Sequence, residues 1–432
     1  MDGALTLSVL KELLLRGMPS RGRGQPLRGR GLVVEDASDE AEEIARRREC
    51  KELEAIDVTG CVSVVFVNAL TDFVNTHMLP HLSDTDSSED DNRAHRRSRS
   101  SRLLSEEPVI FPGLQRLSVR GAKSVPPHVL STFVTAFPSL THLDLSSTRA
   151  GSEILDGLAA SSSLRLQSLS LARCVRLAGS SIRDFLVSAP AASSITELNL
   201  YGDNIFPLSM SAEELRDIIT RAPCFTSGDL VYLDISSAPL DQELLNAIPA
   251  QPKLRSLGLS FIPDLSLGVI SEFLRNKATR VEVLTLLGTS PELVRVPPRQ
   301  ACLALHGEIV RPLCTAPFGL DLSGDALTSQ IPTRLRVIEL TTALLSALGA
   351  GAGSWRIIRS KGGRGWYVNT ASGWVAEKGG TSLRRDLQKG HPWRRALEIL
   401  AEANGNVSSG IGWHARKMEV SALCTPTAFV AM

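Results

Sequence analysis

The 432-residue sequence has few aromatic residues and no organised set of cysteines. Aromatic side chains make up 5% of the chain, which favours a core of aliphatic layers over a core of interlocked rings. The seven cysteines are odd in number and scattered, with no CxxC pair, so neither a disulfide framework nor a zinc knuckle is indicated. We therefore expect reduced cysteines and a location in the cytoplasm or the nucleus.

Signals for membranes, for a global charge and for catalysis are also missing. No apolar run approaches the length of a membrane span, and the N-terminus lacks the order of a signal peptide. The 47 basic and 46 acidic residues balance, so no general attraction to nucleic acid is expected. There is no P-loop or nucleophile elbow, and Pro80 breaks the helix that would align His77 with His81 as metal ligands. We predict no enzymatic activity, no cofactor, no metal site and no membrane association.

What the chain does have is a repeated pattern of an apolar residue, two variable residues, an apolar residue, one variable residue and an apolar residue. LTHLDL, which begins at Leu140, and LQSLSL, which begins at Leu166, are clear examples. A fixed repeat of this kind is typical of solenoid proteins. The ten copies begin at Leu10, Leu53, Leu114, Leu140, Leu166, Ile195, Leu230, Leu254, Val281 and Leu335.

The spacing of the copies predicts one strand and one helix in each repeat. From Leu114 to Val281 the first positions are 26, 26, 29, 35, 24 and 27 residues apart, and the next interval of 54 equals two units of 27. The alternation in each copy turns leucines inward on a short strand. Between strands, helices are predicted after the capping box at Ser211, over 241–247 and over 267–276. We therefore predict an α/β leucine-rich-repeat solenoid, a horseshoe with parallel strands on the concave face and helices on the convex face.

The full pattern LxxLxLxx(C/x), with Cys61 and Cys174 at its last position, resembles the ribonuclease-inhibitor-like and cysteine-containing leucine-rich repeats. The resemblance covers residues 8–350. That family includes substrate receptors of F-box ubiquitin ligases, so the resemblance implies a protein-binding arm and, as possible partners, subunits of an SCF-type ubiquitin ligase. Two features depart from it. Only nine residues precede the first copy, which leaves no room for an F-box, and most copies end in Thr, Ala, Asp or Ile.

The residues between the leucines should line the concave wall. Ten parallel strands about 4.8 Å apart give an inner arc of roughly 45 Å, which suits a protein surface better than a small molecule. We predict a partner-binding site in its middle, because Tyr and Arg most often anchor interfaces. The alternative is a solvated polar wall with scattered charge. The predicted residues are Arg116, Arg120, His142, Asp144, Glu197, Asn199, Tyr201, Tyr232 and Asp234.

Composition divides the chain near residue 350. Residues 1–350 form the predicted repeat domain of about ten repeats, with disordered inserts at 19–38 and 83–107. All five tryptophans lie in residues 351–432, where a hairpin is predicted from Trp355 to Val368 and a third strand near Trp374. Residues 355–417 hold twelve Lys or Arg and four Asp or Glu. This segment is expected to cap the open end of the solenoid, where the N-terminal end has no visible cap.

The predicted function is that of a non-enzymatic scaffold that holds a protein on its concave strand face, similar to the substrate-receptor arm of a ubiquitin ligase. A different class of function is also open. The basic, tryptophan-containing segment at 355–417 could bind an acidic partner or nucleic acid through tryptophan and arginine side chains.

Overall fold

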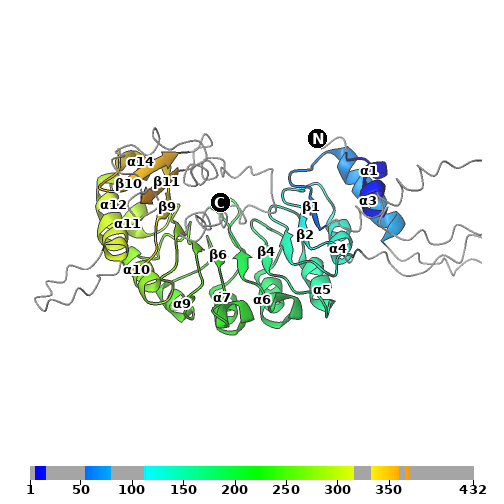
Figure 1. Ribbon diagram of the computed structural model, residues 1–432, viewed down its shortest axis with the longest axis horizontal. Helices are drawn as coiled ribbons and strands as arrows, with labels where there is room; N and C mark the ends of the chain where they lie inside the picture. The colour runs from blue at the N-terminus through cyan, green and yellow to red at the C-terminus, as the bar shows by residue number, and fades with distance from the viewer. Residues whose placement is uncertain are drawn as a thin grey trace, which may run out of the picture.

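The chain forms an arc in which a curved sheet lines the inner side and helices form the outer side (Figure 1). The computed structural model describes residues 5–15, 54–78, 111, 113–315, 332–359 and 365–369. The predicted inserts at 19–38 and 83–107, the third strand near Trp374 and everything beyond residue 369 lie outside these residues. The prediction of an α/β leucine-rich-repeat solenoid is confirmed.

The sheet has eleven strands in the order β1-β2-β3-β4-β5-β6-β7-β8-β9-β11-β10. Strands β1 to β9 are parallel and pair in one register, in which the central leucine of each strand lies opposite the central residue of the next. Nine of the ten predicted copies therefore give a strand. The parallel strands are β1 (Ala55–Asp57), β2 (Arg116–Ser118), β3 (His142–Asp144), β4 (Ser168–Ser170), β5 (Glu197–Asn199), β6 (Tyr232–Asp234), β7 (Ser256–Gly258), β8 (Val283–Thr285) and β9 (Val337–Leu340).

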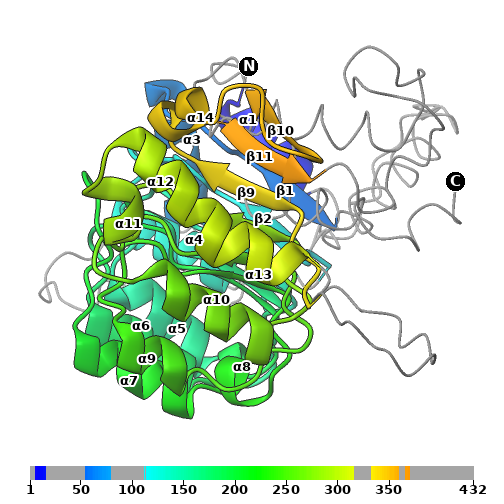
Figure 2. The ribbon, with the colours of Figure 1, turned by 90° about the vertical axis from the view of Figure 1, so that its left-hand side faces the viewer.

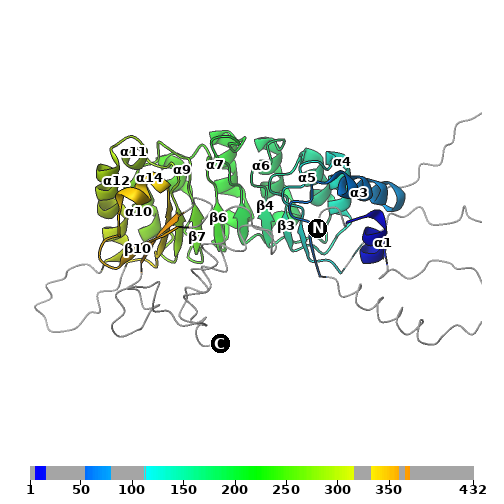
Figure 3. The same ribbon diagram turned by 90° about the horizontal axis from the view of Figure 1, so that it is seen from above.

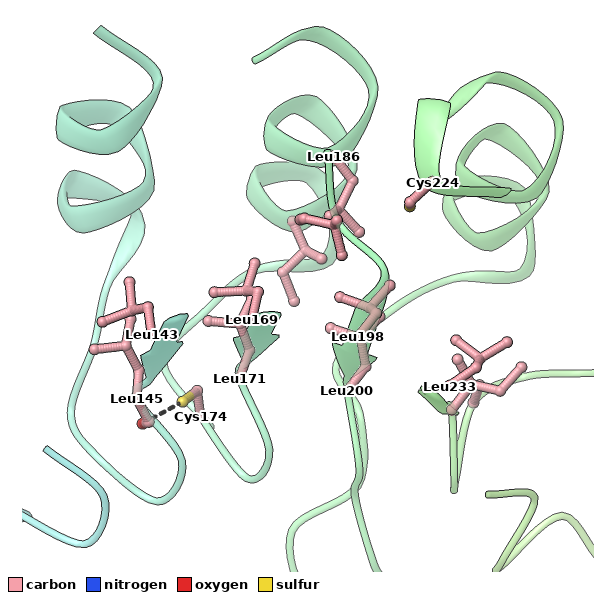
Figure 4. Packing of buried hydrophobic residues seen from close by; sticks show 14 of the residues in the cluster. Leu143, Leu145, Leu169, Leu171, Cys174, Leu186, Leu198, Leu200, Cys224 and Leu233 are labelled. Carbon is pink, nitrogen blue, oxygen red and sulfur yellow. Dashed lines mark hydrogen bonds between the residues drawn. The ribbon is translucent and has the colours of Figure 1, made fainter. Parts of the chain in front are cut away.

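The leucines of the motif form stacked layers behind the sheet, as the repeat period requires. Leu143, Leu169, Leu198 and Leu233 occupy the same position in four neighbouring strands, and each is buried (Figure 4). One repeat could not bury its own apolar face, so each layer depends on the repeats on either side. Cys174 packs at the end of a strand, as predicted. Its Sγ donates to the backbone oxygen of Leu145 at 3.0 Å (Figure 4).

The outer layer consists of helices whose beginnings follow local capping rules. The predicted capping box is confirmed: Glu214 N donates to Ser211 Oγ at 3.2 Å, and Ser211 N donates to Glu214 Oε2 at 2.8 Å. Asp241 and Ser266 cap the two other predicted helices. The helices and short helical turns of the repeats are α3 (Val64–His77), α4 (Pro127–Thr135), α5 (Ser152–Ala160), α6 (Gly179–Ser188), η2 (Pro190–Ala192), α7 (Ala212–Arg221), α8 (Pro223–Thr226), α9 (Gln242–Ala247) and α10 (Leu267–Asn276).

A recurring turn leads each chain segment out of the sheet. In seven repeats, the residue two positions after the last apolar residue of the motif has a positive φ; these residues are Gly60, Gly121, Ser147, Arg173, Ser237, Phe261 and Gly288. The turns bond to one another. Gly121 N donates to Ser146 O at 2.8 Å, and Ser147 N donates to Ala172 O at 2.7 Å. The ladder of backbone hydrogen bonds therefore continues past the strands and places successive turns side by side.

The first predicted strand, at Leu10–Leu15, is wrong. This segment is helix α1 (Leu7–Leu15), which packs against α3 at the N-terminal end of the arc (Figure 3). Its apolar residues also recur at helical intervals of three and four, so the motif alone does not separate a helix from a strand. Leu10 and Leu14 are buried. The expectation that nothing covers the N-terminal end is thus revised.

The interval of 54 residues before β9 does not hide a further strand, because β8 pairs directly with β9. The added length contains helices on the outer layer: α11 (Pro291–Val294), α12 (Pro298–Ala304), the π-helical turn η3 (Leu305–Val310) and α13 (Arg311–Cys314). After β9 and α14 (Thr342–Ala347), the predicted hairpin is confirmed as β10 (Trp355–Arg359) and β11 (Gly365–Asn369). Strand β11 pairs antiparallel with β9 and extends the sheet at this end (Figure 2). Within the described residues, no helix has the length and apolar character needed to cross a membrane.

Candidate functional site: the concave face

The nine predicted binding residues come together on one face of five neighbouring strands. Strand pairing places the first residues of β2 to β6 in one line, and the third residues in a parallel line. Arg120 and Tyr201 follow two positions after the ends of β2 and β5. We call the first line, Arg116, His142, Ser168, Glu197 and Tyr232, the first concave row. The second concave row is Ser118, Asp144, Ser170, Asn199, Asp234, Gly258, Thr285 and Glu339.

The two rows differ in exposure. Arg116 is exposed, and His142 and Glu197 are half-buried, as are Arg120 and Tyr201 beyond the strand ends. Every member of the second concave row is buried. Four of the nine predicted residues, Asp144, Asn199, Tyr232 and Asp234, are therefore not exposed side chains. Their assignment to partner binding stays a prediction.

The second concave row is buried because its acidic and amide side chains fold back onto their own turns. Asp144 Oδ1 accepts hydrogen bonds from Ser146 N at 2.9 Å and from Ser146 Oγ at 2.5 Å. The same arrangement recurs at Asn199, whose Oδ1 accepts from Tyr201 N at 3.0 Å. Asp and Asn commonly bond to the backbone two residues further on, which stabilises a turn. These residues therefore shape the exit from each strand.

Asp234 is the most extensively bonded member of the row. Its Oδ1 accepts from Ser236 N at 3.1 Å and from Ser236 Oγ at 2.6 Å, and its Oδ2 accepts from Tyr232 Oη at 3.3 Å. On the next strand, Gly258 provides the space for the Asp234 carboxylate, because a Cβ at position 258 would lie in contact with it. The glycine in the β7 motif is thus explained by the aspartate in β6.

Tyr201 is the predicted residue with the most distinctive surroundings. The Arg173 guanidinium lies over its ring at 5.4 Å from the centroid, and the Phe261 ring packs edge-on at 6.2 Å between centroids. Burial raises the pKa of the Tyr201 hydroxyl to about 12, so it stays protonated at neutral pH. Arg173 also forms an ion pair with Asp203. Neither Arg173 nor Asp203 was predicted, because both lie in turns outside the strand pattern.

A second group that sequence reasoning missed is an ion pair at the start of β7 and β8. Arg255 Nη2 lies 3.3 Å from Glu282 Oε1, and Glu282 is buried. Burial raises the pKa of the Glu282 carboxyl, and the neighbouring Arg255 opposes that shift. Both residues occupy the second position of the motif, which the alternation of the strand does not assign to either face.

The predicted aromatic segment is used for packing where the structure describes it. Trp355, Trp366 and Tyr367 are buried, and the rings of Trp355 and Tyr367 stack at 5.0 Å between centroids. Tyr367 Oη also lies 3.0 Å from His306 Nε2, which joins the hairpin to η3. Two of the five tryptophans are therefore not free to stack on a base. Binding of an acidic partner or nucleic acid remains a prediction for the part of 355–417 beyond residue 369.

The described residues contain no group of three or more His, Cys, Asp or Glu side chains placed to hold a metal ion. Burial raises the pKa values of the Cys174, Cys224 and Cys314 thiols to about 12. These thiols are protonated at neutral pH and are poor nucleophiles, because the thiolate is the reactive form.

Comparisons with known proteins add little to this picture. No protein-family model matches the chain. No curated protein matches it either. Among solved structures, a crystal structure of a TLR13–ssRNA13 complex is similar over 46% of this chain and 28% of that chain, at 17% sequence identity and a TM-score of 0.25. The aligned part is thus well under two thirds of that protein, and a TM-score of this size carries no weight for function.

Proposed function

We propose that this chain is a non-enzymatic interaction scaffold that binds a protein partner across its concave face. The observation that carries the proposal is the first concave row, which brings Arg116, His142 and Glu197 into line on β2, β3 and β5 with at least part of each side chain exposed. Charges of both signs on a long, rigid wall fit the mixed surface of a folded protein.

The second concave row supports the same proposal as a rigid floor. Asp144 Oδ2 and Asn199 Nδ2 are buried, and neither has a hydrogen-bond partner among the described residues. A buried polar atom without a partner lowers stability by roughly 1–3 kcal/mol. A bound polar group that gave Asp144 a donor and Asn199 an acceptor would remove that penalty.

Site-specific photocrosslinking tests the binding face. The crosslinker p-benzoylphenylalanine is placed at His142 or Glu197 on the concave side, and at Ser188 or Thr220 on the exposed outer helices as matched controls. We expect the two concave positions to capture the same protein in cells, and the two outer positions to capture neither that protein nor any other consistently. Equal capture from the outer helices would contradict the proposal.

The finer proposal is that the captured protein is a substrate presented to an SCF-type ubiquitin ligase. It is supported only by the resemblance of the repeats to those of F-box substrate receptors. Copurification of the full chain with the linker and cullin subunits of such a ligase, in near-equal amounts, is the expected result. Their absence from a preparation that retains the captured partner would remove the ligase role and leave the scaffold role intact.

A further inference from the structure

A second surface lies where the chain leaves the sheet, and it has a different chemistry from the concave rows. It consists of the four turns and loops that follow β2 to β5, at residues 119–127, 145–151, 171–178 and 201–211, which we call the strand-end surface. Arg173 N donates to Tyr201 O at 2.9 Å and so continues the hydrogen-bond ladder from the turns before it. The four loops therefore lie side by side, about 5 Å apart, as the strands do.

The first three loops carry positive charge without any acidic residue. Lys123, Arg149 and Arg176 are exposed, one in each loop, and none of them forms an ion pair with another described residue. Asp203 in the fourth loop is buried and paired with Arg173, so it does not offset these charges. Since the whole chain is nearly neutral, this local imbalance is a property of the surface.

Exposed apolar side chains lie next to these cations. Val175 is 54% exposed, Ile205 is 77% exposed and Phe206 is 40% exposed. In a folded protein such side chains are mostly buried, and neighbouring exposed ones indicate an interaction surface. Val175 occupies the same position in its turn as Lys123 and Arg149 do in theirs, two residues after the positive-φ residue. Charge and apolar area therefore run along one line of equivalent positions.

The turn that presents Ile205 and Phe206 is held rigidly. Asp203 Oδ1 accepts from the backbone N–H groups of Ile205 at 2.9 Å and Phe206 at 2.8 Å. Asp203 N donates to Phe206 O at 3.0 Å, and the other carboxylate oxygen pairs with Arg173. An apolar anchor whose backbone is already fixed loses little entropy on binding. The arrangement is built to hold the two side chains outward.

We propose that the strand-end surface binds an acidic protein segment that carries large apolar side chains. Carboxylates of the segment would lie against Lys123, Arg149 and Arg176, and its apolar side chains against Val175, Ile205 and Phe206. Three loop spacings span about 15 Å, the reach of about five extended residues. A peptide fits better than nucleic acid, because the exposed anchors are mainly aliphatic and offer bases no stacking platform. This site is separate from the concave rows, and either can be present without the other.

Fluorescence anisotropy with the full chain tests the proposal. The probe is a labelled peptide of about ten residues in which Asp or Glu alternates with Leu, matched to the length of the surface. We expect saturable binding that weakens as salt is added, and about a tenfold loss of affinity in the K123S/R149S/R176S variant. The matched control, R275S/R280S/R299S, removes three exposed cations elsewhere and should change affinity by less than about twofold.

The apolar half of the site is tested with I205S/F206S, which leaves every charge in place. We expect a several-fold loss of peptide affinity with an unchanged thermal melt. Three results would overturn the proposal. These are the absence of saturable binding, an equal loss in the control variant, and tighter binding of a single-stranded RNA of equal charge that displaces the peptide. The last result would assign the surface to nucleic acid.

Discussion

The second concave row and the strand-end surface are built by the same repeats, but their polar residues serve different ends. In the row, Asp144 and Asp234 are buried and bonded to their own turns. On the strand-end surface, Lys123, Arg149 and Arg176 are exposed and have no ion-pair partner among the described residues. A polar residue on a solenoid strand can thus be a structural element, while a residue in the loop beside it is available for binding. Substitutions should separate the two roles.

The largest effect is expected for Asp234→Ala. It removes the acceptor for Ser236 N, Ser236 Oγ and Tyr232 Oη in a buried site, which should lower the free energy of unfolding by about 2–4 kcal/mol. Urea denaturation followed by circular dichroism measures this. The control is Asp264→Ala, whose side chain is 79% exposed in a surface ion pair with Arg295 and should matter by less than about 1 kcal/mol. Similar losses in both variants would contradict a structural role for the row.

A smaller loss is expected for Gly258→Ala. The new methyl group would contact the Asp234 carboxylate, which its hydrogen bonds hold in place, so the free energy of unfolding should fall by about 1–3 kcal/mol. Gly307→Ala is the matched control, because a Cβ at position 307 meets no atom within 4 Å. If Gly258→Ala were as stable as the control, Asp234 would have to be free to move.

On the strand-end surface, Ser147→Gly should be stabilising. Ser147 has a φ of 57°, a conformation that glycine adopts without steric penalty, so a gain of about 0.5–1 kcal/mol is expected in the same denaturation experiment. Ser237 has a φ of 63°, but its Oγ accepts from Leu208 N at 2.9 Å. Ser237→Gly loses that bond and should show no gain. A gain of equal size in both would mean that the bond to Leu208 does not contribute.

The smallest effect on stability is expected for Ile205→Ser. Its side chain is largely exposed, so the free energy of unfolding should change by less than about 0.5 kcal/mol. Leu200→Ser, in the buried layer of the same repeat, should lower it by several kcal/mol and serves as the contrast. A large loss at position 205 would show that the loop supports the fold instead of displaying a side chain.

The sequence predicted the solenoid well because the fold depends on a periodic apolar pattern. The copies from Leu53 to Leu335 all became strands, whereas the copy at Leu10 became a helix whose leucines also satisfy helical spacing. The concave residues were placed on the correct face, but their burial was not foreseen. Alternation along a strand determines which way a side chain faces, while its exposure depends on hydrogen bonds within its turn, such as the one between Asp144 and Ser146.

The strand-end surface was not predicted, because loops carry no period. One signal was present: the interval from Ile195 to Leu230 is 35 residues, the longest in the regular series, and the additional length includes the loop with Ile205 and Phe206. An apolar pair in a loop that is longer than its neighbours is therefore a useful indication of a displayed anchor. The ion pair of Arg173 with Asp203, which crosses between two repeats, required coordinates.

Direct pairing of β8 with β9 across 54 residues of sequence has a consequence for how such a protein can change over time. The sheet behaves as a ruler whose divisions are strands, and its graduation ignores how much chain is stored between them on the outer layer. Insertions or deletions among the outer helices would leave the spacing of the inner wall unaltered. A partner bound there would meet the same pattern in variants of quite different length.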